Sequence, residues 1–90
     1  MDFSDAIFSE HAKSEAERRD IPEDVIRQCL SRPSLVRNVR SGRVVVQREI
    51  AFGDPPRHYL LRIFVDIDRS PPRVVTVYRT SKIAKYIGAP

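Results

Sequence analysis

The spacing of apolar residues along the chain changes from a helical to a strand period near Pro33. Upstream of this point, Ala12 and Ala16 lie about one helical turn apart and form a narrow apolar stripe. This spacing predicts a helix from about residue 10 to residue 19. Ser9 is a suitable N-cap, because its hydroxyl can accept a hydrogen bond from a free backbone N–H of the first turn.

A second helix is predicted to begin near Pro22 and to stop before Pro33. Glu23 and Asp24 follow Pro22, and their negative charges complement the dipole of a helix that starts there. The apolar stripe of this helix is expected to contain Val25, Ile26, Cys29 and Leu30. Cys29 is thus expected to be a buried thiol of the core.

Beyond Pro33, short runs rich in valine and isoleucine alternate with polar positions, which is typical of strands. Turn residues interrupt this part of the chain at three places: Ser41-Gly42, residues 53–56 and residues 68–72. The pattern predicts strands over residues 35–40, 44–52, 58–67 and 73–78, with a helical turn or an irregular tail over residues 81–87. Because such short connections join antiparallel neighbours, we expect an antiparallel sheet of about four strands.

The clearest alternation lies in residues 58–67 and divides the side chains of that strand between two faces. The expected core face carries Tyr59, Leu61, Ile63, Val65 and Ile67. The other face carries Leu60, Arg62, Phe64 and Asp66. Two helices packed on one side of the sheet give a two-layer α+β fold in a single domain, residues 1–90. The second face of the sheet is expected to stay largely open around Arg62, and there a ligand or partner would bind.

Charge is distributed unevenly along the chain. Residues 1–31 hold eight acidic and four basic residues, a net charge of −4, whereas residues 32–90 hold four acidic and twelve basic residues, a net charge of +8. Ten of those twelve basic residues are arginines, which suit bidentate contacts to phosphate. The basic strands therefore favour a polyanionic partner, and the alternative is a basic surface that serves only solubility.

Several classes of function find no support in the sequence. The two histidines, His11 and His58, and the single cysteine lack the spacing of metal ligands, so we expect no metal and no cofactor. The three glycines form no phosphate-binding loop, and no serine stands in a nucleophile elbow. The first residues are acidic rather than typical of a signal peptide, and no apolar run is long enough to span a membrane, so a cytoplasmic location is expected.

The segment from Thr76 to Tyr86 concentrates hydroxyls, tyrosines and lysines, a mixture that suits a phosphate-bearing ligand. RNA can be cleaved without a metal if side chains activate the 2′-hydroxyl, protonate the leaving oxygen and stabilise the charged phosphate. The candidate catalytic residues are His11, Arg62, Tyr78 and Lys82. The candidate nucleic-acid-binding residues are Arg18, Arg79, Lys85 and Tyr86.

Each candidate also has a structural interpretation. His11 and Arg18 share a helix face with Glu15, and either could simply pair with it. Tyr78 continues the alternation of Val74 and Thr76 and could belong to the core. The two lysines could lie on a solvated helix face. Arg62 lies between apolar neighbours at the centre of a strand and needs an anion, which would be Asp66, Glu49 or a ligand.

Taken together, the motifs resemble a known family over about residues 7 to 86. The resemblance rests on His11-Ala12, the segment from Arg18 to Val25, Cys29-Leu30, Pro33 and Thr76-Val77-Tyr78. This order is similar to that of the domain-of-unknown-function family numbered 4258. That family has no general assigned activity, but it is similar to the RelE and ParE toxin superfamily, in which a pair of helices packs on an antiparallel sheet.

The resemblance implies a RelE-like domain that acts as a toxin-like, metal-independent RNA endonuclease of a toxin–antitoxin system. RNA or the ribosome would be its target, a small acidic antitoxin-like protein its partner, and no membrane would be involved. Two alternatives remain open. The chain could be a noncatalytic module that binds nucleic acid or protein, or a ParE-like inhibitor of another enzyme. Fold is better supported than chemistry by such a resemblance.

Overall fold

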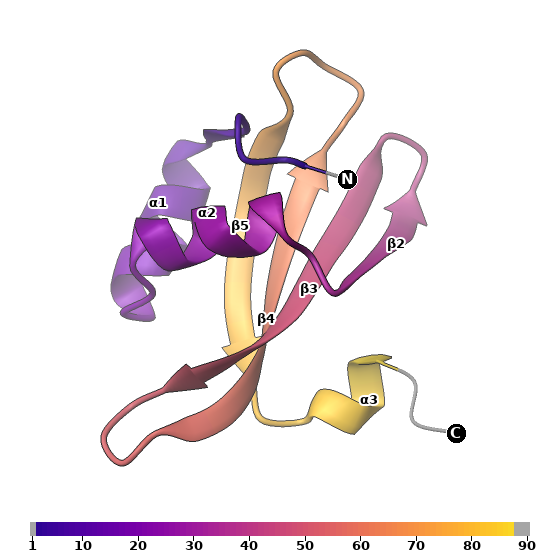
Figure 1. Ribbon diagram of the computed structural model, residues 1–90. Helices are drawn as coiled ribbons and strands as arrows, with labels where there is room; N and C mark the ends of the chain where they lie inside the picture. Colours follow the sequence, from indigo (N-terminus) through magenta and orange to yellow (C-terminus); the bar gives the residue numbers. More distant parts are fainter. Residues whose placement is uncertain (1, 88–90) are drawn as a thin grey trace.

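The computed structural model describes residues 2–87, which form an α+β domain built on a five-stranded sheet (Figure 1). In chain order the elements are β1 (Ile7–Phe8), α1 (Glu10–Arg18), α2 (Glu23–Ser31), β2 (Leu35–Arg40), β3 (Arg43–Phe52), β4 (Arg57–Asp66), β5 (Arg73–Thr80) and α3 (Ile83–Ile87). The expectation of two helices followed by strands is confirmed. No helix within residues 2–87 is both long enough and apolar enough to cross a membrane.

The strand order is β1-β5-β4-β3-β2. The four long strands pair antiparallel with their neighbours in sequence, as their short turns predict. The expectation of about four strands in a purely antiparallel sheet was wrong, because β1 pairs parallel with β5 and makes the sheet mixed. With only two residues, β1 is too short for any alternation to reveal it.

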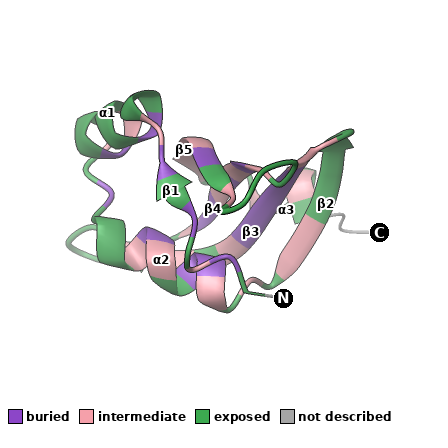
Figure 2. Cartoon of the chain, turned by 90° about the horizontal axis from the view of Figure 1, so that it is seen from above, coloured by how far each residue is buried: buried purple, intermediate pink, exposed green. Residues whose placement is uncertain are grey.

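The main core lies between the sheet and helices α1 and α2, which both cover the same face (Figures 1 and 2). Ile26 and Leu30 from α2 join Leu61, Ile63 and Val65 from β4 in one buried cluster, which confirms the predicted core face of this strand. The cluster includes Cys29 as well, as expected. Ile67, which was assigned to the same face, is exposed because β4 ends one residue earlier.

The opposite face is less open than its sequence indicated. Leu60 was placed there as a non-core residue, yet it is buried together with Val45 and Gln47, outside the cluster beneath the helices. These three residues form a thin second layer. The chain returns over this face after β5, where the Tyr86 ring of α3 lies against Arg62. The sequence of residues 81–87 has no regular pattern, so it did not predict the contact between Tyr86 and Arg62.

A bulge in β5 changes which side chains share a face. Phe64 pairs with Thr76 and Val65 pairs with Val74, so Val75 is an extra residue in β5. Val74 is therefore turned into the core under the helices, whereas Thr76 and Tyr78 share the face of Arg62. Simple alternation had grouped all three β5 residues. The bulge thus removes Tyr78 from the helix-covered core and directs it to the candidate site.

Candidate functional site

Arg62 lies at the middle of β4 on the face turned away from α1 and α2, flanked by Gln47 on β3 and Tyr78 on β5. Its Nε donates a hydrogen bond to Oε1 of Gln47 at 2.8 Å, and its Nη1 donates one to the Tyr78 hydroxyl. Both acceptors are neutral. The sheet thus fixes the orientation of the guanidinium without neutralising its charge.

The carboxylate that could have paired with Arg62 has another partner. Asp66 lies four residues further along β4 and accepts a 2.6 Å hydrogen bond from Nε of Arg43. This arginine lowers the pKa of Asp66 below its usual value through the hydrogen bond, while burial opposes the shift. Within residues 2–87, Arg62 forms no ion pair. Its positive charge in the middle of this face is therefore not neutralised by a carboxylate.

Aromatic rings surround the guanidinium of Arg62. The Tyr86 ring centroid lies 4.0 Å from its Cζ, and those of Phe64 and Tyr78 lie at 5.3 and 5.6 Å. Phe64 and Tyr78 also stack on each other, with centroids 6.2 Å apart. Such an arrangement holds a planar cation and offers ring faces nearby, which are the two features that bind phosphates and stacked bases.

Gln47 gives the site an unusual buried donor. Its side chain is fully buried, and its Oε1 is occupied by Arg62, but its Nε2 has no hydrogen-bond partner among residues 2–87. A buried amide donor without an acceptor costs free energy. The Gln47 amide therefore offers a free donor directly beneath the Arg62 guanidinium.

The surroundings of Tyr86 make its hydroxyl more acidic than usual. A hydrogen bond with the Tyr78 hydroxyl lowers the pKa of Tyr86 below its usual value, and the charges of Lys85 and Arg62 act in the same direction against the effect of burial. Nζ of Lys85 lies 5.3 Å from the ring centroid of Tyr86. The Tyr78 hydroxyl thus accepts a hydrogen bond from the Arg62 guanidinium and also contributes to the lowered pKa of Tyr86.

The structure therefore brings together Arg62, Tyr78, Lys85 and Tyr86, of the residues expected from the sequence. Lys82 is exposed at the start of the α3 turn, and its backbone N–H donates to the Thr80 hydroxyl. Arg18 is exposed and forms a bidentate pair with Glu15, as its structural interpretation held. The neighbouring Arg19, and not Arg18, lies near the site, with its Cζ 6.0 Å from the centroid of the Tyr78 ring.

His11 lies at the other end of α1. The helix starts beside Val74, to whose carbonyl Ser9 donates a hydrogen bond, and it ends where Arg79 donates to the carbonyl of Arg19. From His11 to Arg19 the helix advances about 12 Å. His11 is exposed, and within residues 2–87 its side chain forms no hydrogen bond or ion pair with the group around Arg62.

Arg79 lies on the opposite face from Arg62. Its Cζ is 3.8 Å from the Phe52 ring centroid and 5.5 Å from that of Tyr59, and its Nη1 donates to the carbonyl of Arg19. These contacts tie the end of α1 to the far ends of β3 and β4. In this arrangement Arg79 stabilises the fold on the side of the sheet that carries the helices.

A family comparison adds to this geometry. The model of a family described as a domain of unknown function, DUF4258, matches residues 8–79. The chain belongs to the DUF4258 family. No curated protein and no solved structure shows significant similarity to it.

The DUF4258 match divides the candidate site. Arg62, Gln47 and Tyr78 lie within the matched residues, whereas Lys85 and Tyr86 lie beyond residue 79, although the resemblance was expected to extend to residue 86. The sheet part of the site thus belongs to the family domain of this chain. The α3 part follows that domain.

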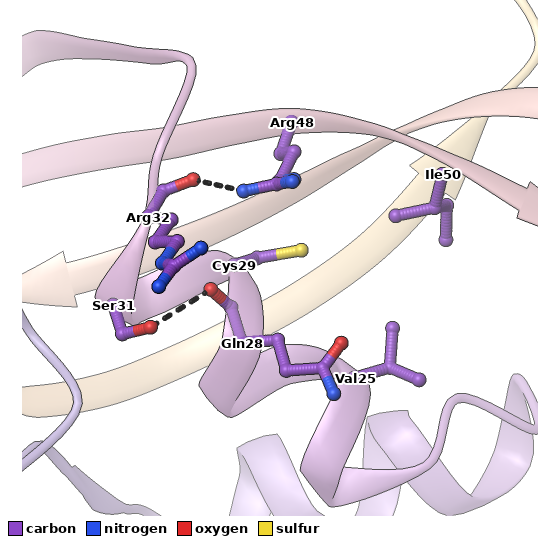
Figure 3. Close-up of a pocket in the computed structure, with 7 residues that line it drawn as sticks. All are labelled: Val25, Gln28, Cys29, Ser31, Arg32, Arg48 and Ile50. Carbon is purple, nitrogen blue, oxygen red and sulfur yellow. Dashed lines mark hydrogen bonds between the residues drawn. The ribbon is translucent and has the colours of Figure 1, made fainter.

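A second feature of this DUF4258 domain was missed in the sequence. A hollow of about 420 Å³ lies between α2 and β3, with Arg32 and Arg48 among its walls (Figure 3). Arg48 is a charged residue on the apolar side of β3, in register with Leu61 of the core face. This break in the alternation after Val44 and Val46 was the available signal, because a cation on a core-facing position requires a reason.

Proposed function

We propose that this DUF4258 protein binds single-stranded RNA on the sheet face that carries Arg62. The observation that carries the proposal is the state of Arg62, whose guanidinium is oriented by two neutral acceptors, surrounded by aromatic rings and left without a carboxylate. Proteins recognise unpaired RNA by such combinations of arginine and aromatic side chains. The net charge of +8 over residues 32–90 supports attraction of the polyanion.

A titration of fluorescein-labelled single-stranded RNA, followed by anisotropy, tests this proposal. Arg62→Gln should weaken binding about 10- to 100-fold, because a hydrogen bond to a charged group contributes about 1.5–3 kcal/mol. Arg57→Gln is the matched control, since it removes the same charge from an exposed position of the same strand. Equal losses in the two variants would mean that RNA binds through net charge and not through this site.

A second candidate function is cleavage of the bound RNA. The placement of Tyr86 between Arg62 and Lys85 favours it, and the direction of the Tyr86 pKa shift agrees. In this scheme the Tyr86 phenolate accepts the proton of the 2′-hydroxyl, whose oxygen attacks the phosphorus. The bond from phosphorus to the 5′-oxygen breaks, and a protonated group such as Lys85 supplies a proton to that oxygen. Arg62 stabilises the charge on the phosphate, and the products are a 2′,3′-cyclic phosphate and a 5′-hydroxyl end.

Cleavage is tested by gel analysis of RNA incubated with EDTA and the purified chain. Tyr86→Phe should lower the cleavage rate about 10²- to 10⁴-fold while RNA affinity remains. His11→Ala tests the expectation that His11 is the acid or base. The distance of its helix end from Tyr78 favours unchanged cleavage in this variant. Intact RNA in all reactions would leave binding as the function.

The likeness to RelE and ParE toxins that the sequence led us to expect motivates a third candidate, a toxin with an acidic antitoxin-like partner. Induced expression of the chain alone, with growth and total RNA followed in time, tests that role. Growth arrest with RNA fragmentation is expected of a ribonuclease toxin. Arrest with DNA damage would instead indicate a ParE-like inhibitor, and unimpaired growth would contradict toxicity.

A further inference from the structure

The hollow between α2 and β3 lies on the helix-covered side of the sheet, behind the face that carries Arg62. Arg48 and Ile50 line it from β3, and Val25 and Gln28 line it from α2 (Figure 3). In Figure 3 the two arginine side chains, Arg32 and Arg48, are at one end and the two aliphatic side chains at the other. The site is therefore distinct from the proposed RNA-binding face.

The charged end of the hollow has no internal counterion. None of its lining residues is acidic, and within residues 2–87 neither Arg32 nor Arg48 takes part in an ion pair. Nη1 of Arg48 donates a 2.6 Å hydrogen bond to the carbonyl of Arg32, at the C-terminal end of α2. This bond orients the Arg48 guanidinium and leaves its other N–H groups for a further acceptor.

The remaining walls are apolar or weakly polar. Val25 and Ile50 are half-buried and pack against the main core, so their outer surfaces form a firm apolar wall. The Cys29 thiol lies between this wall and the arginines, and burial raises its pKa to about 11, so it stays neutral at neutral pH. The hollow thus combines two cations at one end with a neutral, apolar surface at the other.

We infer that this hollow binds a small organic anion with a compact apolar body. The carboxylate or phosphate head would be held by Arg48 and Arg32, and the body would lie against Val25 and Ile50. Arginine pairs anionic oxygens in a bidentate manner, and an apolar wall of this size accommodates a single ring or a short branched chain. A volume of about 420 Å³ falls within the range of small-molecule pockets.

A residue-resolved ¹H–¹⁵N NMR titration of the whole chain tests the inference with three probes: benzoate, phenyl phosphate and benzyl alcohol. The two anions should shift the amides of residues 25–32 and 48–50 in a saturable way, and the neutral alcohol should not. Whether benzoate or phenyl phosphate binds more tightly identifies the head group. Benzyl alcohol binding as well as benzoate, or no saturation by about 10 mM of either anion, would overturn the inference.

Variants separate this site from general attraction to a basic protein. Arg48→Gln should weaken the bound anion by about tenfold or more, whereas Arg57→Gln should leave its affinity within about twofold. Because Arg48 also binds the end of α2, its loss could unfold the domain. Gln28→Glu provides a second test that does not remove this bond. Gln28 is exposed, so the substitution should leave the fold intact, and the new negative charge should weaken the affinity for an anion several-fold. Equal affinities in Gln28→Glu and the parent would contradict the assigned position.

Discussion

Arg62 and Arg79 lie on adjacent strands of one sheet, and aromatic rings stack on both guanidinium groups, but on opposite faces. Arg79 donates to the carbonyl of Arg19 at the end of α1, where the helix dipole supplies partial negative charge. Arg62 donates to a neutral amide and a neutral hydroxyl. Stacking on aromatic rings therefore does not by itself distinguish a binding arginine from a structural one. Arg79 joins a helix end to the sheet, whereas Arg62 lies on the face that α1 and α2 leave uncovered.

The largest loss of stability is expected from a core substitution in β4, the strand on which both faces of the sheet depend. Leu61 is fully buried in the helix-covered core and pairs across the sheet with Arg79, next to Arg62 in sequence. Leu61→Ala should lower the free energy of unfolding by about 2–5 kcal/mol, because it removes buried contacts and leaves a cavity. Urea unfolding followed by circular dichroism measures the change. A loss below about 1 kcal/mol would mean that the core lies on the other face.

RNA affinity should separate two arginine variants that both lose stability. Arg79→Gln should lower the free energy of unfolding by about 1–3 kcal/mol, because it loses a ring contact and a hydrogen bond to a helix end, and should change RNA affinity little. Arg62→Gln also loses ring contacts and hydrogen bonds, so it should lower the free energy of unfolding too, but it should weaken RNA binding as well. Urea unfolding and RNA anisotropy on both proteins provide the four measurements. Similar changes in both properties for both variants would remove the distinction between the two faces.

A third arginine sharpens the contrast, since Arg43 shares a partly buried ion pair with Asp66. The pair depresses the pKa of Asp66 below its usual 3.8, so its stabilising effect is present above pH 3.8 and is lost as the pH falls through the lower folded-state pKa. The unfolding free energies of the parent and of Arg43→Gln should thus differ at pH 7 and converge toward strongly acidic pH. A difference that is constant from pH 7 to pH 2 would contradict this role.

Much of the architecture could be predicted because it depends on local periodicity. The alternation of residues 58–67 located Leu61, Ile63 and Val65 in the core, and the helical stripe located Ile26 and Leu30. The missing parts depend on contacts between distant segments. A two-residue β1 has no period, and neither does the bulge at Val75 that separates Val74 from Tyr78.

The candidate site was predictable in part for the same reason. Arg62 and Tyr78 stood out as polar groups on regular strands, and the register of β4 with β5 brings them together. Gln47 was overlooked because an uncharged residue in a strand attracts no notice until its buried amide is seen. His11 was grouped with them from the order of elements alone. The direction of α1 along β5, which separates them, could not be read from the sequence.

The smallest effect, and the most specific, concerns salt. Each phosphate neutralised on single-stranded nucleic acid adds about −0.7 to the slope of log affinity against log salt concentration. If Arg62 contacts a phosphate, Arg62→Gln should make the slope shallower by about 0.7, whereas Arg79→Gln should leave it unchanged because that guanidinium is bound to the end of α1. RNA titrations at several salt concentrations measure both slopes. A parallel line for Arg62→Gln, displaced only in affinity, would place the arginine against a base and not against a phosphate, and the stacking with Tyr86 would then be the contact that RNA replaces.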